Sequence, residues 1–221
     1  NRAVVNPKKE LLEKNITGKN ILVTGAGGSI GSELCRQIKV LEPKTIVFYE
    51  NSEYNLYKIN QELNKDDNII IVPLLATVTN YKQLKTTLKK YKIDTIFHAA
   101  AYKHVPIVEL NPIEGVYNNV IGTYLLAKAA HEESIENMVL ISSDKAVRPT
   151  NVMGASKRFS EMVLQAFSSI KTNTCFSMVR FGNVIDSAGS VVPLFRQQIN
   201  SGGPITITHR NITRYFMSIP E

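Results

Sequence analysis

Short apolar runs alternate along this chain with longer segments in which apolar positions recur every three to four residues. The runs are rich in Val, Ile, Leu and Phe and lie at residues 20–25, 45–50, 68–73, 94–100, 137–143 and 174–181. The segments of helical period lie at residues 29–41, 53–63, 81–91, 113–133 and 150–169, and Asn80 is placed to cap the third. This alternation predicts βαβ units, and therefore an α/β protein built on a doubly wound parallel sheet.

The pattern is different at the two ends of the chain. Residues 1–19 form a polar leader, and residues 20–181 hold the predicted strands and helices of the main domain. In residues 182–221, Gly and Pro interrupt the pattern, and we expect a short helix at 191–200 and a strand at 205–208. This last part looks like the beginning of a small substrate-covering lobe, which we expect to be incomplete.

Composition and charge narrow the possible partners. The chain has 221 residues, of which 43% are hydrophobic, so it can bury a large core. Much of its formal net charge of +7 comes from lysines dispersed over predicted helix surfaces, and no nucleic-acid-binding motif accompanies them. The longest apolar run, residues 69–78, is interrupted by Pro73 and is too short to span a bilayer. We therefore expect neither a nucleic-acid partner nor direct membrane contact.

Cys35 and Cys175 are the two cysteines, and they lie far apart inside predicted elements. We expect both thiols to be buried and structural, with neither a disulfide nor a thiolate metal site. This cysteine usage fits a reducing compartment, the cytoplasm.

The first predicted strand leads directly into the sequence GAGGSIG. Gly25, Gly28 and Gly31 have the spacing G-x-x-G-x-x-G, and a predicted helix begins within the motif. Glycine permits a tight turn, so that backbone N–H groups and the helix N-terminus can approach a pyrophosphate. Because the motif joins the first strand and helix of a βαβ unit, it predicts a dinucleotide site. The expected cofactor-binding residues here are Gly25, Gly28, Ser29, Ile30 and Gly31.

Glu50 ends the second predicted strand, where an acidic residue normally accepts hydrogen bonds from the adenosine ribose. Its carboxylate would repel a 2′-phosphate, so Glu50, with Asn51 beside it, favours NAD over NADP. A carboxylate that merely ends the strand is the alternative. After the fourth run, three small residues let a dinucleotide lie across the sheet edge, whereas His98 is expected to make a structural hydrogen bond. These small residues are Ala99, Ala100 and Ala101.

Six ordered motifs extend this pattern along the chain: GAGGSIGSE, HAAAYKHVPIVE, NNVIGT, SSDKAVRPTNVMGASKR, RFGNV and GGPITITHRNITRYFM. Together they resemble the extended short-chain dehydrogenase/reductases, in particular the UDP-N-acetylglucosamine 4,6-dehydratases of the larger, membrane-associated type. The resemblance covers about residues 17–221 and implies a Rossmann-like NAD-binding domain, a UDP-sugar substrate, a homo-oligomer and a role in bacterial glycan biosynthesis. It also implies that this chain is a catalytic fragment, whose parent protein is anchored at the cytoplasmic face of the inner membrane.

Two positions depart from patterns common among these relatives. Smaller soluble relatives carry tyrosine four residues before the active-site lysine, whereas this chain has Met153 before Lys157, as in the larger type. The turn after the third strand usually contains an aspartate that contacts adenine, and here Thr77 stands in its place.

The resemblance implies that NAD takes a hydride from carbon 4 of the hexose, water is lost across carbons 5 and 6, and the hydride returns to carbon 6. The elimination needs a base and an acid, and the resemblance assigns these roles to Lys145 and Asp144. Desolvation would lower the pKa of the lysine and raise that of the aspartate, while their mutual attraction opposes both shifts. An exposed Asp-Lys turn pair is the alternative.

Lys157 is expected to bind the nicotinamide ribose and to stabilise a developing alkoxide. Met153 is expected to pack against the sugar or the nicotinamide. A thioether cannot transfer a proton, so the proton acceptor for the first oxidation stays open between Ser143, Asp144 and a water. The resemblance assigns further residues to the substrate: Asn183 and Arg214 to the diphosphate, Thr206 to uridine, and Lys103 and His104 to the sugar.

Two other functions stay open. A nucleotide-sugar 4-epimerase shares the first oxidation but needs no elimination pair, so Asp144 and Lys145 favour the dehydratase. A non-catalytic NAD-dependent regulator would explain Met153 as the mark of a lost activity, and cofactor occupancy without turnover would identify it.

Overall fold

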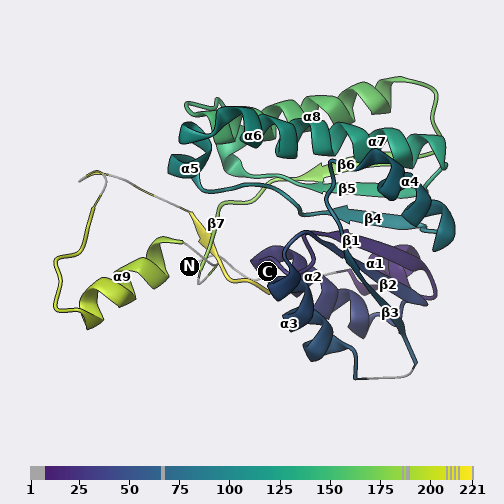
Figure 1. Ribbon diagram of the computed structural model, residues 1–221, viewed down its shortest axis with the longest axis horizontal. Helices are drawn as coiled ribbons and strands as arrows, with labels where there is room; N and C mark the ends of the chain where they lie inside the picture. Colours follow the sequence, from purple (N-terminus) through teal and green to yellow (C-terminus); the bar gives the residue numbers. More distant parts are fainter. Residues whose placement is uncertain are drawn as a thin grey trace.

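The computed structural model describes residues 8–65, 68–185, 187, 190–207, 209, 211, 213 and 215–220. Its centre is a sheet with helices on both faces (Figure 1). The six strands are parallel and lie in the order β3-β2-β1-β4-β5-β6. They are β1 (Asn20–Thr24), β2 (Thr45–Glu50), β3 (Ile70–Leu75), β4 (Thr95–His98), β5 (Asn137–Ile141) and β6 (Cys175–Val179). The order reverses between β1 and β4, which confirms the predicted doubly wound fold.

Helices bury both faces of the sheet, which explains why the strands read as nearly continuous apolar runs. Ile21 and Val23 of β1 belong to one core cluster, and Leu22, between them, belongs to the other. The first cluster also contains residues of α2 (Ser29–Val40) and α3 (Glu53–Leu63), and the second those of α4 (Tyr81–Lys90), α7 (Gly122–Glu132) and α8 (Val152–Ser169). Asn80 accepts a hydrogen bond from the Gln83 amide at 3.1 Å, so the predicted cap of α4 is confirmed.

The single helix predicted at residues 113–133 is three consecutive elements in the structure. These are α6 (Pro112–Val116), a π-helical turn (Tyr117–Ile121) and α7. The π-helical turn buries Asn118 and Asn119. Asn119 accepts a hydrogen bond from the Tyr102 amide at 2.8 Å and donates one to the Tyr102 carbonyl at 3.0 Å. The turn therefore ties this helical layer to the loop that follows β4.

Two helices lie where the sequence analysis predicted none. The first, α1 (Lys9–Ile16), falls inside the predicted leader and buries Ile16. The second, α5 (Val105–Leu110), has Pro106 in its first turn, where proline is tolerated, and it ends before Asn111. Both helices are short, so their periodicity is weak.

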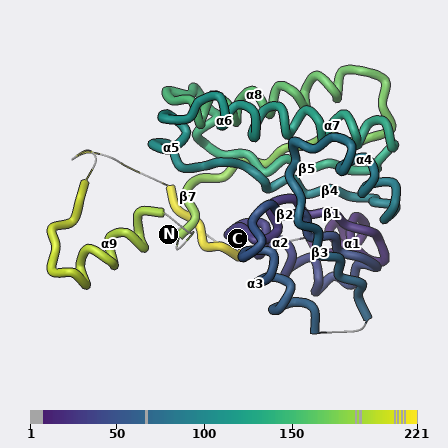
Figure 2. Tube along the Cα trace, viewed as in Figure 1, coloured from purple at the N-terminus to yellow at the C-terminus, as the bar shows by residue number. Residues whose placement is uncertain are grey.

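The C-terminal part forms a small unit beside the main sheet. It contains β7 (Asn183–Val184), α9 (Val191–Asn200) and β8 (Phe216–Met217), and β7 pairs with β8 in parallel. The predicted helix at residues 191–200 is confirmed, but residues 205–207 of the predicted strand are not in a strand. Thr206 bonds to the side chain of Gln198 in α9 instead. The end of the chain then returns to α2 (Figure 2). There Gln37 donates a hydrogen bond to the Pro220 carbonyl at 3.0 Å.

The two thiols differ in burial. Cys35 is buried in α2, as expected, but Cys175 is exposed, so that expectation was wrong. Cys175 begins β6, which lies at the edge of the sheet and has no further strand beside it among the described residues. No helix in the described part of the chain is both long and apolar enough to cross a membrane.

Candidate active site

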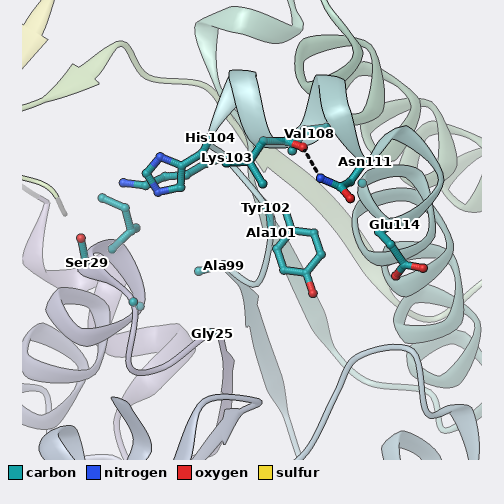
Figure 3. A pocket seen from close by; sticks show the side chains of 15 residues that line it. Gly25, Ser29, Ala99, Ala101, Tyr102, Lys103, His104, Val108, Asn111 and Glu114 are labelled. Carbon is teal, nitrogen blue, oxygen red and sulfur yellow. Dashed lines mark hydrogen bonds between the residues drawn. The ribbon is translucent and has the colours of Figure 1, made fainter. Parts of the chain in front are cut away.

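Three adjoining cavities follow the carboxyl ends of the strands around the point where the strand order reverses. Their volumes are about 450, 200 and 260 Å³. Ala99, Ala101 and Tyr102, which follow β4, line all three, so the cavities adjoin one another and are together called the groove. Figure 3 shows the largest, from Lys103 and His104 on one side to Glu114 on the other. Ligands of doubly wound sheets bind at this kind of crevice.

The glycine motif forms one wall of the 450 Å³ cavity, which all five of its predicted cofactor-binding residues line. Gly25 has φ 65°, and a Cβ atom there would lie 2.8 Å from the backbone of Ala100. A Cβ atom on Gly31 would lie 1.9 Å from the Gly25 carbonyl oxygen. Only glycine fits these two positions, because the loop after β4 packs tightly against Gly25 and the turn packs tightly against the start of α2 at Gly31. The resulting wall of bare backbone beside a helix N-terminus fits a dinucleotide pyrophosphate.

Glu50 lies in the wall of the 200 Å³ cavity and is 5% exposed. Its Oε2 atom accepts a hydrogen bond from the Gly27 amide at 2.9 Å. Its Oε1 atom accepts from the Asn51 and Ser52 amides, both at 3.0 Å. Backbone groups therefore hold the carboxylate beside the glycine turn. A carboxylate has about four acceptor positions, so this arrangement retains capacity for a ribose hydroxyl.

Asn51 and Ala100 line the same cavity, and their cofactor role stays a prediction. Thr77 is not among the described residues that line this cavity. Its hydroxyl lies 2.8 Å from the hydroxyl of Thr79. Sequence analysis missed several residues of this wall, although the quoted NNVIGT motif contains one of them, Asn118. The missed residues are Tyr49, Asn55, Ala76, Val78, Tyr102 and Asn118.

The 260 Å³ cavity brings together most of the predicted catalytic and sugar-binding side chains. Those on its wall are Lys103, His104, Ser143, Lys145, Met153, Lys157 and Asn183. Described residues that the sequence analysis missed complete this wall, and they include Ser142, Phe181, Ser187 and Ser190. Asp144 is not among the residues that line the cavity, although its neighbours Ser143 and Lys145 are.

Asp144 and Lys145 stand in a 3-10 turn, Asp144–Ala146, directly beyond β5. The Lys145 Nζ atom donates hydrogen bonds to Asp144 Oδ1 at 3.3 Å and to Asn183 Oδ1 at 3.1 Å. Ser143 donates to the same Asp144 oxygen at 3.1 Å. The side chains of Lys145 and Asp144 are 35% and 42% exposed. The described residues therefore hold the pair as an ion pair and do not provide the desolvation that the sequence argument required.

Lys157 and Met153 occupy successive turns of α8, and both are buried. The Lys157 Nζ atom donates a hydrogen bond to the Ile141 carbonyl at 2.7 Å. Burial lowers the pKa of Lys157 to about 8, against the opposing effect of the Glu161 charge. A lysine with this pKa is mostly charged at neutral pH and is placed to stabilise negative charge in the cavity.

Two more basic side chains lie close to this site. Partial burial, followed by the positive charge of Lys145, lowers the pKa of Lys103. His98 lies behind the cavity and shares hydrogen bonds with the hydroxyls of Thr24 at 2.7 Å and Thr123 at 2.9 Å. Burial, with a smaller effect of Lys157, lowers the pKa of His98 to about 3. The prediction of a structural role for His98 is confirmed.

Two predicted substrate residues are not brought to the groove. Thr206 is exposed, lies beside α9 and lines none of the three cavities. Arg214 lies outside the described residues. Their roles stay predictions.

A sequence profile described as "Polysaccharide biosynthesis protein" matches residues 21–221. Among similar proteins, the capsular polysaccharide biosynthesis protein CapD of Staphylococcus aureus is 49% identical over 96% of this chain and 36% of its own length. A UDP-N-acetylglucosamine 4,6-dehydratase (inverting) of Campylobacter jejuni is 33% identical over 92% of this chain and 61% of its own. A UDP-glucose 4-epimerase of Rickettsia bellii is 35% identical over 92% and 60%. The chain thus spans about a third of the first relative and three fifths of the others.

Solved structures share the fold. Pen from Bacillus thuringiensis superimposes with a TM-score of 0.86 at 35% identity, covering 93% of this chain and 65% of that one. The dTDP-glucose 4,6-dehydratase DesIV of Streptomyces venezuelae, whose structure has NAD and TYD bound, superimposes with a TM-score of 0.81. At 20% identity and a coverage of 90% of this chain and 68% of that one, the second match concerns the fold alone.

Proposed function

The chain belongs to the polysaccharide biosynthesis protein family of extended short-chain dehydrogenase/reductases, and from this membership we propose that it is the catalytic part of an NAD-dependent UDP-N-acetylglucosamine 4,6-dehydratase. The observation that carries the proposal is the contact between Asp144 and Lys145, because Lys145 lines the same cavity as Lys157 and Met153. An acid and a base side by side are what an elimination across adjacent carbons needs.

NAD, bound along the groove, supplies the chemistry of hydride removal from carbon 4 and hydride return to carbon 6. The chain's own residues handle the protons and the charge. Lys157, on the cavity wall, stabilises negative charge on the oxygen at carbon 4. Met153 offers no proton and acts as an apolar surface for the sugar or the nicotinamide ring.

The elimination needs a neutral amine as base and a protonated carboxyl as acid. One proton transfer across the 3.3 Å contact converts the Lys145–Asp144 ion pair into these two forms. A bound substrate favours the transfer because it removes water from both groups, and desolvation disfavours charge. Lys145 then accepts the carbon 5 proton, and Asp144 donates a proton to the hydroxyl that leaves carbon 6. Both groups return to the ion pair, so the step is balanced without a further proton donor.

The basic wall of the groove supports an anionic substrate. Lys103 and His104 line both the largest cavity and the catalytic one, so they adjoin the cofactor and the sugar positions. Asn183 is held beside Lys145, and in the proposal it contacts the substrate diphosphate, with Arg214 and Thr206 kept as further substrate residues. Glu50 selects NAD over NADP through its buried negative charge.

We also infer a homo-oligomer in which the helical layer over β4 and β5 contacts a second copy. This layer exposes large apolar side chains that a monomer would leave in water. They are Ile107, Leu110, Ile113, Val116, Tyr117, Tyr124, Phe159 and Met162. The location proposed for the whole protein is the cytoplasmic face of the inner membrane.

A 4-epimerase is the second candidate, since a relative of this name is 35% identical to the chain. It would use the same cofactor groove and Lys157. It would not need Lys145 and Asp144 as an elimination pair, so the fate of the 6-hydroxyl separates the two functions.

The deciding experiment incubates the full-length protein with UDP-N-acetylglucosamine in heavy water and analyses the sugar by mass spectrometry and NMR. We expect a 4-keto-6-deoxy sugar that carries solvent deuterium at carbon 5 and the original carbon 4 hydrogen at carbon 6. By resemblance to the methionine-bearing enzymes, the configuration at carbon 5 should be retained. An epimerised sugar with its 6-hydroxyl intact would establish the epimerase, and bound NAD without any change in the sugar would favour the regulator.

A further inference from the structure

Behind the catalytic turn, α8 carries a carboxylate that the proposed mechanism does not use. Glu161 is 0% exposed. Three side chains donate hydrogen bonds to its carboxylate. Its Oε1 atom accepts from Ser142 Oγ at 2.6 Å and from Arg180 Nε at 2.7 Å. Its Oε2 atom accepts from Arg180 Nη2 at 2.5 Å and from Arg158 Nη1 at 3.0 Å. The arginine pairing is thus bidentate, the geometry that gives such pairs their rigidity.

Arg158 lies on α8 itself, whereas the other two partners of Glu161 lie at the ends of two neighbouring strands. Ser142 follows β5 and stands two residues before the Asp144–Ala146 turn, while Arg180 follows β6 and precedes Phe181. The Ser142 amide bonds to the Val179 carbonyl at 2.8 Å, and the Asp144 amide bonds to the Phe181 carbonyl at 3.0 Å. The pairing of β5 and β6 therefore continues beyond both strands into the segment that carries the proposed acid and base.

Holding the sheet together does not require this carboxylate. Five residue pairs already join β5 and β6, from Asn137 opposite Cys175 to Ile141 opposite Val179. Enclosing a charge costs free energy unless its hydrogen bonds are well made, and a packed apolar residue often serves stability equally well. Glu161 instead joins the two strand ends that lie beyond these residue pairs.

We propose that Glu161 is a positioning residue, which clamps Ser142 and Arg180 together and so fixes the two strand ends that carry Asp144–Lys145 and Asn183. This inference rests on the proposed function, because it gives the clamp an acid and a base to hold. Small displacements of reacting groups are costly, about 100-fold in rate for about 1 Å. Lys145 meets both Asp144 and Asn183, which come from the two different strand ends, so a loosened clamp would separate them.

The charge of Glu161 supports the same assignment. Burial raises its pKa, but the hydrogen bonds from Arg180, Ser142 and Arg158 outweigh this and hold the pKa at about 2. The carboxylate is therefore ionised throughout the working pH range. It stands one turn after Lys157 on α8 and raises the pKa of that lysine against the effect of burial.

The test compares full-length wild-type protein with Glu161→Gln, which keeps the size of the side chain and removes its charge. The matched control is Glu132→Gln, which removes a carboxylate that binds Lys85 and Tyr81 on the helical layer away from the groove. We expect Glu161→Gln to lower kcat, expressed per NAD-binding site, about 100-fold. KM and the affinity for NAD should change much less. The control should keep the wild-type kcat.

Amide hydrogen exchange gives a second readout that needs no substrate. In Glu161→Gln the amides of Ser142 and Asp144 should exchange at least about tenfold faster, because local opening becomes easier. The amide of Ala99, which bonds to the Thr24 carbonyl at 3.1 Å beyond β4, should keep its wild-type rate. Equal acceleration at all three amides would indicate general destabilisation and would overturn the positioning role.

Two further variants keep the inference testable. Glu161→Asp keeps the negative charge but has a shorter side chain. Its pH profile of activity should therefore resemble that of the wild type, while its kcat should stay lowered. Should Glu161→Gln not fold, Ser142→Ala carries the test, since it removes one hydrogen bond and leaves both arginine pairs. Unchanged exchange at Asp144 in the folded variants would refute the clamp. If the wild-type protein does not dehydrate the sugar, the proposed function fails, and the exchange measurements still decide the role of Glu161.

Discussion

Lys145 donates a hydrogen bond from Nζ to Oδ1 of Asp144, its neighbour in sequence, across 3.3 Å. The same nitrogen is 3.1 Å from Asn183 Oδ1, so its position depends on a residue 38 positions away along the chain. In the proposed mechanism this contact is the path along which one proton moves to produce the base and the acid together.

Replacing Lys145 separates the two halves of the reaction. Lys145→Ala should still oxidise carbon 4 and accumulate some reduced cofactor, since Lys157 and the cofactor groove are unchanged. Product formation should fall by at least about 100-fold, the usual contribution of a general base. Absorbance of the reduced nicotinamide and NMR of the sugar measure the two halves independently. Wild-type turnover in this variant would remove Lys145 from its role.

Met153 and Lys157 should differ sharply in their sensitivity to substitution. Met153→Leu conserves volume in a buried site and should retain most of the activity. Lys157→Ala should lose nearly all of it, because the charge that stabilises the alkoxide is gone. Steady-state kinetics on both variants test this difference. An inactive Met153→Leu that still binds NAD would mean that the thioether itself takes part.

The pKa of Lys157 predicts a dependence of stability on pH. Folding lowers this pKa from 10.5 to about 8, so between these values the unfolded state binds more protons than the native state. Below pH 8 the native state therefore carries the full free-energy cost of the buried charge. This cost disappears as the pH rises towards 10.5, so the free energy of unfolding increases by roughly 3 kcal/mol. Urea unfolding of wild type and Lys157→Met across this range should show the wild type gaining stability relative to the variant. A constant difference would mean that the pKa is not lowered.

Glu50 should control cofactor choice. Wild-type protein should bind NAD more tightly than NADP in fluorescence titrations, because the buried carboxylate repels the 2′-phosphate. Glu50→Gln should reduce the difference between the affinities for NAD and NADP. Since Glu50 also accepts the Gly27 amide at 2.9 Å, NAD affinity should fall as well. A wild-type preference for NADP would contradict the assignment.

Replacing either of two glycines in the phosphate turn with alanine should have different effects, one on the stability of the fold and the other on NAD affinity. At Gly31 a Cβ atom would lie 1.9 Å from the Gly25 carbonyl oxygen, so Gly31→Ala should destabilise the fold by about 1–3 kcal/mol or more. At Gly28 the nearest atom would be 3.3 Å away, so Gly28→Ala should fold but bind NAD weakly, because Gly28 lines the proposed cofactor cavity and a methyl group adds bulk there. Thermal unfolding and NAD titration of both variants distinguish the two effects.

Local regularities of the sequence were enough to predict the doubly wound sheet, most of its helices and the glycine turn. The six apolar runs and the helix at residues 191–200 lie where they were expected, because periodicity reports which face of an element is buried. The spacing of the glycines predicted the turn itself, but the contact that requires glycine at position 25 is with Ala100, far away in sequence. The short helices α1 and α5 and the π-helical turn at Tyr117–Ile121 were missed, because their periodicity is weak or broken by proline and by long-range hydrogen bonds.

Contacts between distant parts of the chain could be decided only by the tertiary structure. The exposure of Cys175 depends on the place of β6 at the sheet edge, which no local pattern encodes. Asp144 and Lys145 are neighbours in sequence, but only the folded chain shows that Lys145 lines the cavity and Asp144 does not. Glu161 reads in the sequence as an ordinary helix glutamate. It becomes a buried clamp because packing brings α8, β5 and β6 together, and a charge enclosed there must find its hydrogen bonds among residues far away in sequence.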